Sequence, residues 1–163
     1  MRELSRRGRW CVSESTLRTF IPEPENTFRA AMTRHVRTRI VDRIAPGLYL
    51  NPYASVPAWA PERLASHLRP HDSMYVSLES ALHEHGYISQ VPSRLTLMTS
   101  GRSYTYNTPL GVIEFVHTSR ATSAWRERSK LVLERGIHVA SAELALEDLR
   151  HVRRNLGLVE GDD

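Results

Sequence analysis

The sequence predicts an α+β protein built from two parts, and three observations lead to this fold class. The first third of the chain contains two stretches with helical periodicity, followed by a hairpin pattern. Residues 51–61 contain three prolines, which is typical of a connector. The remainder combines helices with short strands that lie close together along the chain, without crossover helices, and this predicts a small antiparallel sheet. We therefore expect one domain over residues 1–52 and a mixed α/β domain over residues 53–163, with residues 53–61 as the connector.

The positive charge of the chain is concentrated in its first part. The 163 residues carry 22 basic and 18 acidic side chains, and this net charge of +4 excludes no class of partner. Residues 1–52 hold ten arginines and five acidic residues, whereas residues 53–163 are close to neutral. Arginine forms paired hydrogen bonds with phosphates and base edges, so the distribution favours a nucleic-acid partner for the first domain.

Cysteine usage and hydropathy indicate where the protein resides. A single cysteine, Cys11, excludes an intramolecular disulfide and indicates a reducing compartment, and we expect it to be a small core residue. No run approaches the roughly 20 apolar residues that span a bilayer. The basic N-terminus is not followed by the apolar segment of a secretory signal. We expect a cytoplasmic protein that does not enter a membrane.

Two helices are predicted in the middle of the first domain. Ser13 can cap a short helix that ends near Phe20, because Pro22 pushes the residue before it out of the helical region. A longer helix follows from Asn26, its expected cap, to Arg37 or the residue after it. The apolar stripe of this longer helix consists of Phe28, Ala31, Met32 and Val36.

A hairpin is predicted over residues 40–50, where two β-rich runs flank the turn pair Pro46-Gly47. Residues 2–10 supply a first helix, which Gly8 weakens by about 1 kcal/mol. Short helix, turn, longer helix and hairpin, in this order, predict a winged helix-turn-helix domain whose longer helix enters the major groove of DNA. The expected DNA-binding residues are Thr27, Arg29, Thr33, Arg34, Arg37, Arg39 and Arg43.

The second domain is predicted to mix helices and strands. The expected helices span residues 61–68, 77–85 and 141–155, and Gly157 stops the last of them. The expected strands span residues 94–99, 103–107 and 111–117, with a further hairpin formed by residues 130–133 and 137–139. Trp59 and Trp125 fall in or near predicted loops, where they contact a partner or pack at a domain junction.

The sequence also resembles the AbiEi antitoxins of type IV (abortive infection E) toxin–antitoxin systems, over nearly the whole chain. The resemblance lies in residues 11–22, 27–32, 45–52, 75–86, 90–92, 95–101, 108–117 and 137–149. It implies a transcriptional autorepressor that binds operator DNA, with inverted repeats and a possible dimer on the DNA. It also implies an antitoxin that neutralises a nucleotidyltransferase toxin, with the C-terminal domain central to that task.

Enzymatic and metal-dependent functions find little support in the residue pattern. His83 and His85 are two residues apart and point to different sides of a helix, and Pro70 interrupts the helix between His67 and His71. Glycine-rich phosphate loops and a nucleophile elbow are absent from the sequence. We expect no enzymatic activity, cofactor or metal.

Two alternatives stay open. One is a winged-helix regulator whose C-terminal domain senses a ligand or forms a dimer. The other is a metal-dependent nuclease, although its candidate carboxylates Glu79, Glu84 and Glu114 are scattered along the chain and Lys130 is the only lysine.

Overall fold

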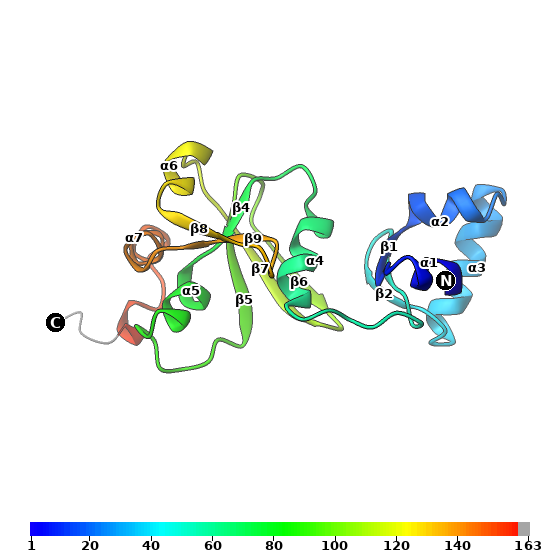
Figure 1. The fold of residues 1–163 in the computed structure, drawn as a ribbon, viewed down its shortest axis with the longest axis horizontal. Coiled ribbons are helices and arrows are strands. Elements are labelled where there is room, and N and C mark those ends of the chain that lie inside the picture. Colours follow the sequence, from blue (N-terminus) through cyan, green and yellow to red (C-terminus); the bar gives the residue numbers. More distant parts are fainter. Residues whose placement is uncertain (160–163) are drawn as a thin grey trace. The chain divides into compact units, whose positions relative to one another are not determined.

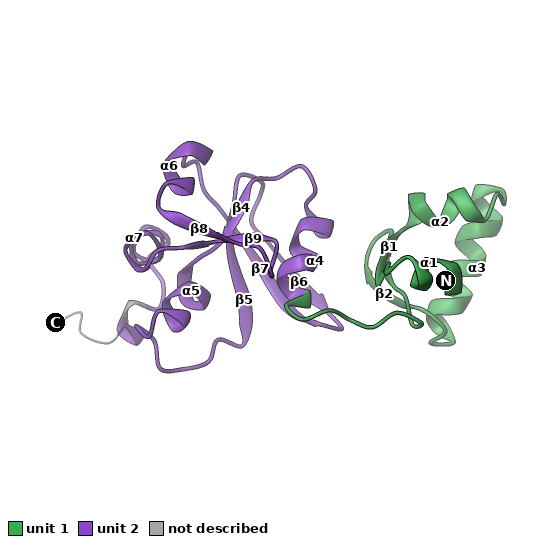
Figure 2. Cartoon of the chain, viewed as in Figure 1, with its two compact units in different colours: residues 1–60 green, residues 61–163 purple. Residues whose placement is uncertain are grey.

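The chain divides into two compact units, residues 1–60 and residues 61–163 (Figure 2). The computed structural model describes residues 1–159. Within them it contains seven α-helices, one short 3-10 helix and nine strands in two sheets, which confirms the predicted α+β class. The division falls at the end of the proline-rich segment, eight residues after the boundary expected at residue 52.

Unit 1 consists of three helices and a small antiparallel sheet of order β1-β3-β2 (Figure 1). Its elements are α1 (Arg2–Arg6), β1 (Cys11–Ser13), α2 (Glu14–Phe20), α3 (Glu25–Arg37), β2 (Asp42–Ala45) and β3 (Leu48–Leu50). The sequence did not predict β1, because its first two side chains are both buried and no alternation marks the strand.

Local sequence explains where these elements begin and end. The Ser13 hydroxyl accepts a hydrogen bond from the Thr16 N–H at 3.2 Å, which confirms the predicted cap of α2. The cap predicted at Asn26 is wrong: α3 begins at Glu25 with Pro24 at its N-cap, so Asn26 lies inside the first turn. The predicted hairpin is confirmed, and Gly47 takes the positive φ of 72° that its two-residue turn requires.

One apolar core holds unit 1 together. It consists of Leu4, Val12, Leu17, Phe28, Met32, Val41 and Tyr49, with Met1 and Val36 packed against it. The buried amide of Asn51 ties the end of β3 to the N-terminal segment, because its Nδ2 donates to the carbonyls of Met1 and Arg9 at 3.1 and 2.8 Å. The core therefore includes one residue from α1 and two from α3, and it fixes which side of α3 is buried.

Unit 2 is a six-stranded sheet of order β6-β7-β5-β4-β9-β8, with helices packed on it (Figure 1). Its strands are β4 (Met74–Val76), β5 (Arg94–Thr99), β6 (Tyr104–Thr108), β7 (Gly111–His117), β8 (Ser129–Val132) and β9 (Ile137–Ala140). Its helices are α4 (Ala60–Leu68), α5 (Leu78–Glu84), α6 (Thr122–Arg126), α7 (Ala142–Val152) and the short η1 (Leu156–Leu158).

The prediction of a small antiparallel sheet in this part of the chain is wrong. The pairs β4–β9 and β5–β7 are parallel, so the sheet is larger than expected and mixed. The prediction assumed that strands adjacent along the chain pair with each other. Instead β7 lies between β5 and β6, and it pairs with β5 in parallel and with β6 in antiparallel orientation.

Two local predictions in unit 2 also need correction. Trp125 does not lie in an exposed loop but is buried in α6, where its ring stacks on Tyr75 at a centroid distance of 4.7 Å. The last helix ends at Val152 rather than at residue 155. Arg153 takes a left-handed conformation with a φ of 53° and so ends the helix before Gly157.

Among residues 1–159, no helix combines the length and apolar character that a bilayer crossing needs.

A buried guanidinium joins three segments of unit 2. Arg135, in the turn between β8 and β9, donates from Nη2 to Glu62 of α4 at 3.0 Å and from Nη1 to Glu84 of α5 at 2.8 Å. Burial alone lowers the pKa of Arg135, but the bonds and charges of Glu84 and Glu62 outweigh it, and the net shift is upward. Glu62 and Glu84 therefore depend on Arg135 for compensation of their charge.

We predict that Arg135→Met destabilises unit 2 by about 3 kcal/mol, because removing one partner of a buried ion pair leaves the remaining charge uncompensated. Urea unfolding followed by the fluorescence of buried Trp125 measures the change. Arg102→Met removes an exposed arginine of the same unit and should change stability by less than about 0.5 kcal/mol. Equal unfolding midpoints for the two variants would contradict this role of Arg135.

Candidate nucleic-acid interface

The outer face of α3 is the most basic helical face of unit 1. Phe28 and Met32 are 2 % and 7 % exposed and face the core, so the residues that follow them by one, Arg29 and Thr33, lie on the solvent side. Arg37 continues that row one turn later. All seven residues expected to bind DNA are exposed: Thr27, Arg29, Thr33, Arg34, Arg37, Arg39 and Arg43.

Two of these residues on α3 already have side-chain partners within unit 1. The Arg29 guanidinium contacts Glu25, one turn before it in α3, at 2.6 Å, and lies 4.0 Å from Glu14 of α2. The Thr33 hydroxyl donates to the Arg29 carbonyl at 2.8 Å. Exposed ion pairs are weak, so Arg29 can exchange Glu25 for a phosphate, although the nearby carboxylates oppose that exchange. The spacing of Glu25 and Arg29, four residues apart, is the sequence signal for this pair.

Arg34 and Arg37 have no ion pair with any described residue and extend from the second half of α3. Arg39 follows the end of α3 in a left-handed conformation with a φ of 56°. Arg43 lies on β2, where its Nε donates to the Ala45 carbonyl at 3.3 Å. The positive charge that α3 presents most openly therefore comes from Arg34 and Arg37.

The β2–β3 hairpin is short and tied to α2. The Glu14 N–H, at the start of α2, donates to the Gly47 carbonyl at 2.7 Å. This bond fixes the hairpin turn against the helix that precedes α3. Arg43 is the only cationic side chain in the segment 42–50, so the hairpin offers a single basic contact.

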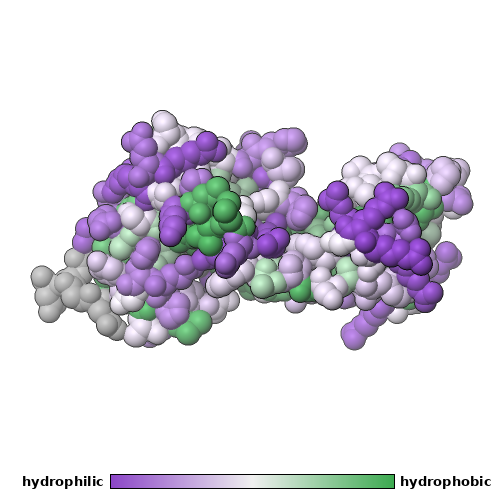
Figure 3. Space-filling model, viewed as in Figure 1, coloured by the Kyte–Doolittle hydropathy of each residue, from purple (hydrophilic) through white to green (hydrophobic). Residues whose placement is uncertain are grey.

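A second group of arginines surrounds α1, and it was not among the predicted site residues. It consists of Arg2, Arg6, Arg7 and Arg9, all of them exposed. Figure 3 shows hydrophilic residues across this part of unit 1. Arg6 and Arg7 both contact Glu3, at 3.5 and 3.3 Å, which reduces the net charge that they present. The run of arginines in the first nine residues is the sequence signal for this group.

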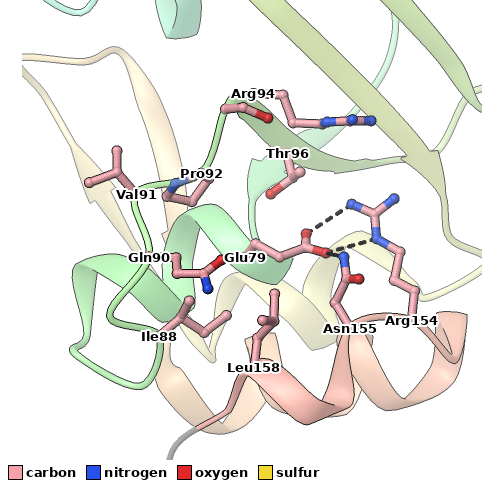
Figure 4. Close-up of a pocket in the computed structure, with 11 residues that line it drawn as sticks. Glu79, Ile88, Gln90, Val91, Pro92, Arg94, Thr96, Arg154, Asn155 and Leu158 are labelled. Carbon is pink, nitrogen blue, oxygen red and sulfur yellow. Dashed lines mark hydrogen bonds and ion pairs between the residues drawn. The ribbon is translucent and has the colours of Figure 1, made fainter.

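In unit 2, two of the three candidate nuclease carboxylates meet at one arginine. Arg154 contacts Glu79 of α5 at 2.8 Å and Glu114 of β7 at 2.7 Å, and the Asn155 amide also donates to Glu79 at 2.6 Å. Figure 4 shows Arg154 and Asn155 pointing at the Glu79 carboxylate beside a cavity of about 450 Å³. Glu84 lies apart from them and contacts Arg135.

Two arginines balance the charge of the two carboxylates, because Arg94 of β5 also lies 3.4 Å from Glu114. Burial raises the pKa of Glu79, but the hydrogen bonds from Arg154 and Asn155 outweigh it and hold that pKa below its ordinary value of 4.5. Among the described residues, no group of three or more histidine, cysteine or acidic side chains is arranged to hold a metal ion. The cluster is therefore better suited to fix the segment after α7 than to bind a cation.

His83, His85 and Cys11 lie in structural surroundings. His83 Nδ1 and His85 Nε2 lie 3.0 and 2.8 Å from the carbonyls of Ile88 and Ala140, respectively. Cys11 is buried, as expected for a small core residue, and burial raises the pKa of its thiol to about 12. The thiol therefore stays protonated, and poorly nucleophilic, at neutral pH.

No family model matches the chain, and no curated protein is significantly similar to it.

The Glu79 contacts predict a pH-dependent contribution to stability. Because the pKa of Glu79 is lowered by folding, its contribution is complete above about pH 4.5 and is lost as the pH falls through the lower pKa of the folded protein. Glu79→Gln should therefore lower the urea midpoint at pH 7, and the difference from the wild type should shrink towards pH 3. Glu127→Gln, which alters an exposed carboxylate of the same unit, serves as the control. A difference that grows at acidic pH would contradict this assignment.

Proposed function

We propose that unit 1 is a winged helix-turn-helix domain that binds operator DNA through α3. We further propose that the chain is a transcriptional autorepressor and antitoxin, similar to the AbiEi family, which neutralises a nucleotidyltransferase toxin encoded beside it. The observation that carries the DNA-binding proposal is the outer face of α3. There Arg34 and Arg37, without an ion pair to any residue of 1–159, extend from a helix fixed to the core by Phe28 and Met32.

The topology of unit 1 supports this proposal. In its order α1-β1-α2-α3-β2-β3, with the sheet order β1-β3-β2, a short turn separates α2 from α3 and a hairpin follows, and this order favours a winged helix-turn-helix. In that architecture the second helix of the pair, which corresponds to α3, enters the major groove, and the first, which corresponds to α2, crosses the DNA backbone. The β2–β3 hairpin would then bring Arg43 to the backbone beside the groove.

The charge of unit 1 supports a DNA partner on electrostatic grounds. Residues 1–60 carry ten arginines and five acidic residues. If about four phosphates are contacted, the logarithm of the affinity should fall with the logarithm of the salt concentration with a slope of about −3.6. Arg34 and Arg37 supply two of these contacts, while Arg39 and Arg43 are available for the others.

The antitoxin role rests on the resemblance of unit 2 to the family, notably over residues 75–86 and 108–117. The near-neutral charge of unit 2 fits a protein partner better than a nucleic acid. The nuclease alternative is disfavoured by a specific contact. Glu79 and Glu114, the carboxylates it needs, are both bound to Arg154, and Glu84 is bound to Arg135.

Three substitutions on α3 test the DNA-binding proposal with opposite expected signs. Arg34→Ala and Arg37→Ala should each weaken binding to the chain's own promoter and reduce the magnitude of the salt slope by about 0.9. Glu25→Gln should tighten binding about threefold, because it removes a negative charge and releases Arg29. Fluorescence anisotropy over a series of salt concentrations measures both affinity and slope.

Matched controls lie on unit 2. Arg102→Ala and Glu127→Gln make the same charge changes at exposed positions outside unit 1, and they should leave the salt slope unchanged. If the controls alter binding as much as the α3 variants do, net charge rather than α3 governs the affinity, and the proposal is wrong.

Coexpression with the product of the neighbouring open reading frame tests the antitoxin role. The double variant Arg34→Ala/Arg37→Ala should lose repression of its promoter and still rescue growth, because the two activities are assigned to different units. Residues 61–163 alone should also rescue. A neighbouring frame that does not encode a nucleotidyltransferase, or toxicity that the wild-type chain does not relieve, contradicts the antitoxin role and leaves the DNA-binding proposal standing.

A further inference from the structure

The solvent side of α1 combines arginines with two exposed aromatic rings. The rings belong to Phe20, the last residue of α2, and to Tyr53, which follows β3, and these residues are 46 % and 52 % exposed. All of the residues concerned lie within unit 1. We call them the α1 surface, which consists of Arg2, Arg6, Arg7, Arg9, Phe20 and Tyr53.

Each ring of the α1 surface is paired with a guanidinium. The Arg2 guanidinium carbon lies over the Tyr53 ring, 5.2 Å from its centroid, and that of Arg7 lies over the Phe20 ring at 5.8 Å. A cation at this distance is attracted to the face of an aromatic ring. Arg2 begins α1 and Arg7 follows its last residue, so the two pairs lie at opposite ends of the helix.

Backbone contacts hold the rings in place. The Tyr53 N–H donates to Asn51 Oδ1 at 3.2 Å, and the Tyr53 carbonyl accepts a hydrogen bond from the Ser5 hydroxyl of α1. Phe20 is held by the last turn of α2. The position of each ring therefore depends on its main chain rather than on burial of the ring itself.

The α1 surface is distinct from the outer face of α3. Leu4 of α1 packs into the same core as Phe28 and Met32 of α3. Arg2 and Arg6 each lie two residues from Leu4, which places them roughly 200° around the helix from it, on the solvent side. Because both helices turn their apolar sides to one core, their basic sides face outward from it in different directions.

The charge of the α1 surface fits an anionic partner. Four arginines and a single acid, Glu3, lie among the first 13 residues. Arg2 and Arg9 have no ion pair with any described residue. Glu3 lies 3.5 Å from Arg6 and 3.3 Å from Arg7, in exposed pairs. Exposed pairs are weak, so phosphates can replace Glu3 as the partner of both guanidinium groups.

The two rings favour unpaired bases over a duplex as the rest of that partner. The bases of a duplex are stacked on one another, and a protein surface outside the grooves meets only sugar and phosphate. A single strand exposes the faces of its bases, which stack on aromatic side chains and on guanidinium planes. A cationic surface with two half-exposed rings offers contacts to phosphates and to bases together.

We propose that the α1 surface binds a single strand of nucleic acid. Its arginines contact the phosphates, and bases stack on the open faces of Phe20 and Tyr53. The chemistry is shared by unpaired DNA and unpaired RNA. This binding goes beyond the duplex binding proposed for α3 and does not rest on it.

Four labelled probes of about 12 nucleotides, within the site sizes of single-strand binders, test the proposal by fluorescence anisotropy. Oligo-dU and oligo-U differ only in the 2′-hydroxyl, so their relative affinities show whether the surface prefers DNA or RNA. An abasic strand retains the phosphates but has no base to stack, and it should bind at least about fivefold more weakly than oligo-dU. A duplex of oligo-dU with oligo-dA is the fourth probe.

Ring substitutions separate stacking from charge. Phe20→Leu and Tyr53→Leu keep an apolar side chain, and each should weaken binding to oligo-dU by about fivefold or more, the loss expected when one base stack is removed. Tyr104→Leu removes a ring of unit 2 that is 58 % exposed and should leave the affinity unchanged. Circular dichroism and the urea midpoint should match the wild type for all three variants, because about half of each residue is exposed.

Arginine substitutions separate the α1 surface from α3. Arg2→Gln and Arg9→Gln should each reduce the magnitude of the salt slope for oligo-dU by about 0.7, whereas Arg102→Gln in unit 2 should not change it. The double variant Arg34→Ala/Arg37→Ala should lose the promoter duplex and retain most of its affinity for oligo-dU.

A wild-type chain that binds neither oligo-dU nor oligo-U below about 100 µM at low salt overturns the proposal. So do ring variants that bind as tightly as Tyr104→Leu, and so does an abasic strand that binds as tightly as oligo-dU, because either result reduces the surface to charge alone. Ring variants that weaken binding to the duplex probe as much as to oligo-dU assign the surface to duplex DNA and also overturn it.

The α3 variant distinguishes failure of this proposal from failure of the proposed function. If Arg34→Ala/Arg37→Ala loses oligo-dU as completely as the promoter duplex, α3 binds the single strand and the α1 proposal is wrong. If the promoter duplex does not bind to the wild-type chain at all, only the function proposed for α3 is contradicted, since the single-strand measurements do not use it.

Discussion

The burial of Phe28 and Met32 in the core of unit 1 is the constraint on which the proposed function depends. A helix with one apolar stripe can bury only that stripe, so the core contacts to α1, β1, α2 and β3 determine the rotation of α3. The opposite side, with Arg34 and Arg37, must then face solvent. The Ser13 cap and the bond from Glu14 to Gly47 fix α2 and the hairpin on either side of it. The basic face is thus a consequence of core packing rather than of an isolated charge pattern.

The two units use charge in different ways. In unit 1, exposed arginines outnumber the acids, and the exceptions, Arg29 with Glu25 and Arg6 and Arg7 with Glu3, are exposed pairs that can open. In unit 2, several arginines form ion pairs within the unit. Arg135 holds α4 and α5 to the β8–β9 turn, and Arg154 holds the segment after α7 to α5 and β7. A count of basic residues alone therefore overstates the cationic surface of unit 2, and the difference between the units favours DNA for the first and a protein for the second.

Local signals in the sequence predicted much of the fold, but they did not predict which distant strands pair with each other. The cap at Ser13, the strands 94–99 and 111–117 and the turn at Gly47 follow from hydrophobic period and turn chemistry, which act between near neighbours. The parallel pairs β4–β9 and β5–β7 join segments that no local rule connects, so the sheet was predicted too small and purely antiparallel. The same limit applies to sites. Glu79 and Glu114 share Arg154, and the buried Asp148 of α7 accepts hydrogen bonds from the hydroxyls of Tyr75 and Ser77. Both arrangements depend on contacts between segments that are far apart in the chain.

The central claim is that α3 is the surface that meets DNA, and residue-resolved NMR tests it most directly. A titration of the ¹⁵N-labelled chain with a duplex from its own promoter reports which amides change their environment. The account predicts perturbations concentrated in α3 and the β2–β3 hairpin, with the strongest around Arg34 and Arg37, and little change in unit 2. Perturbations centred on unit 2, or on α1 with α3 unaffected, would contradict it.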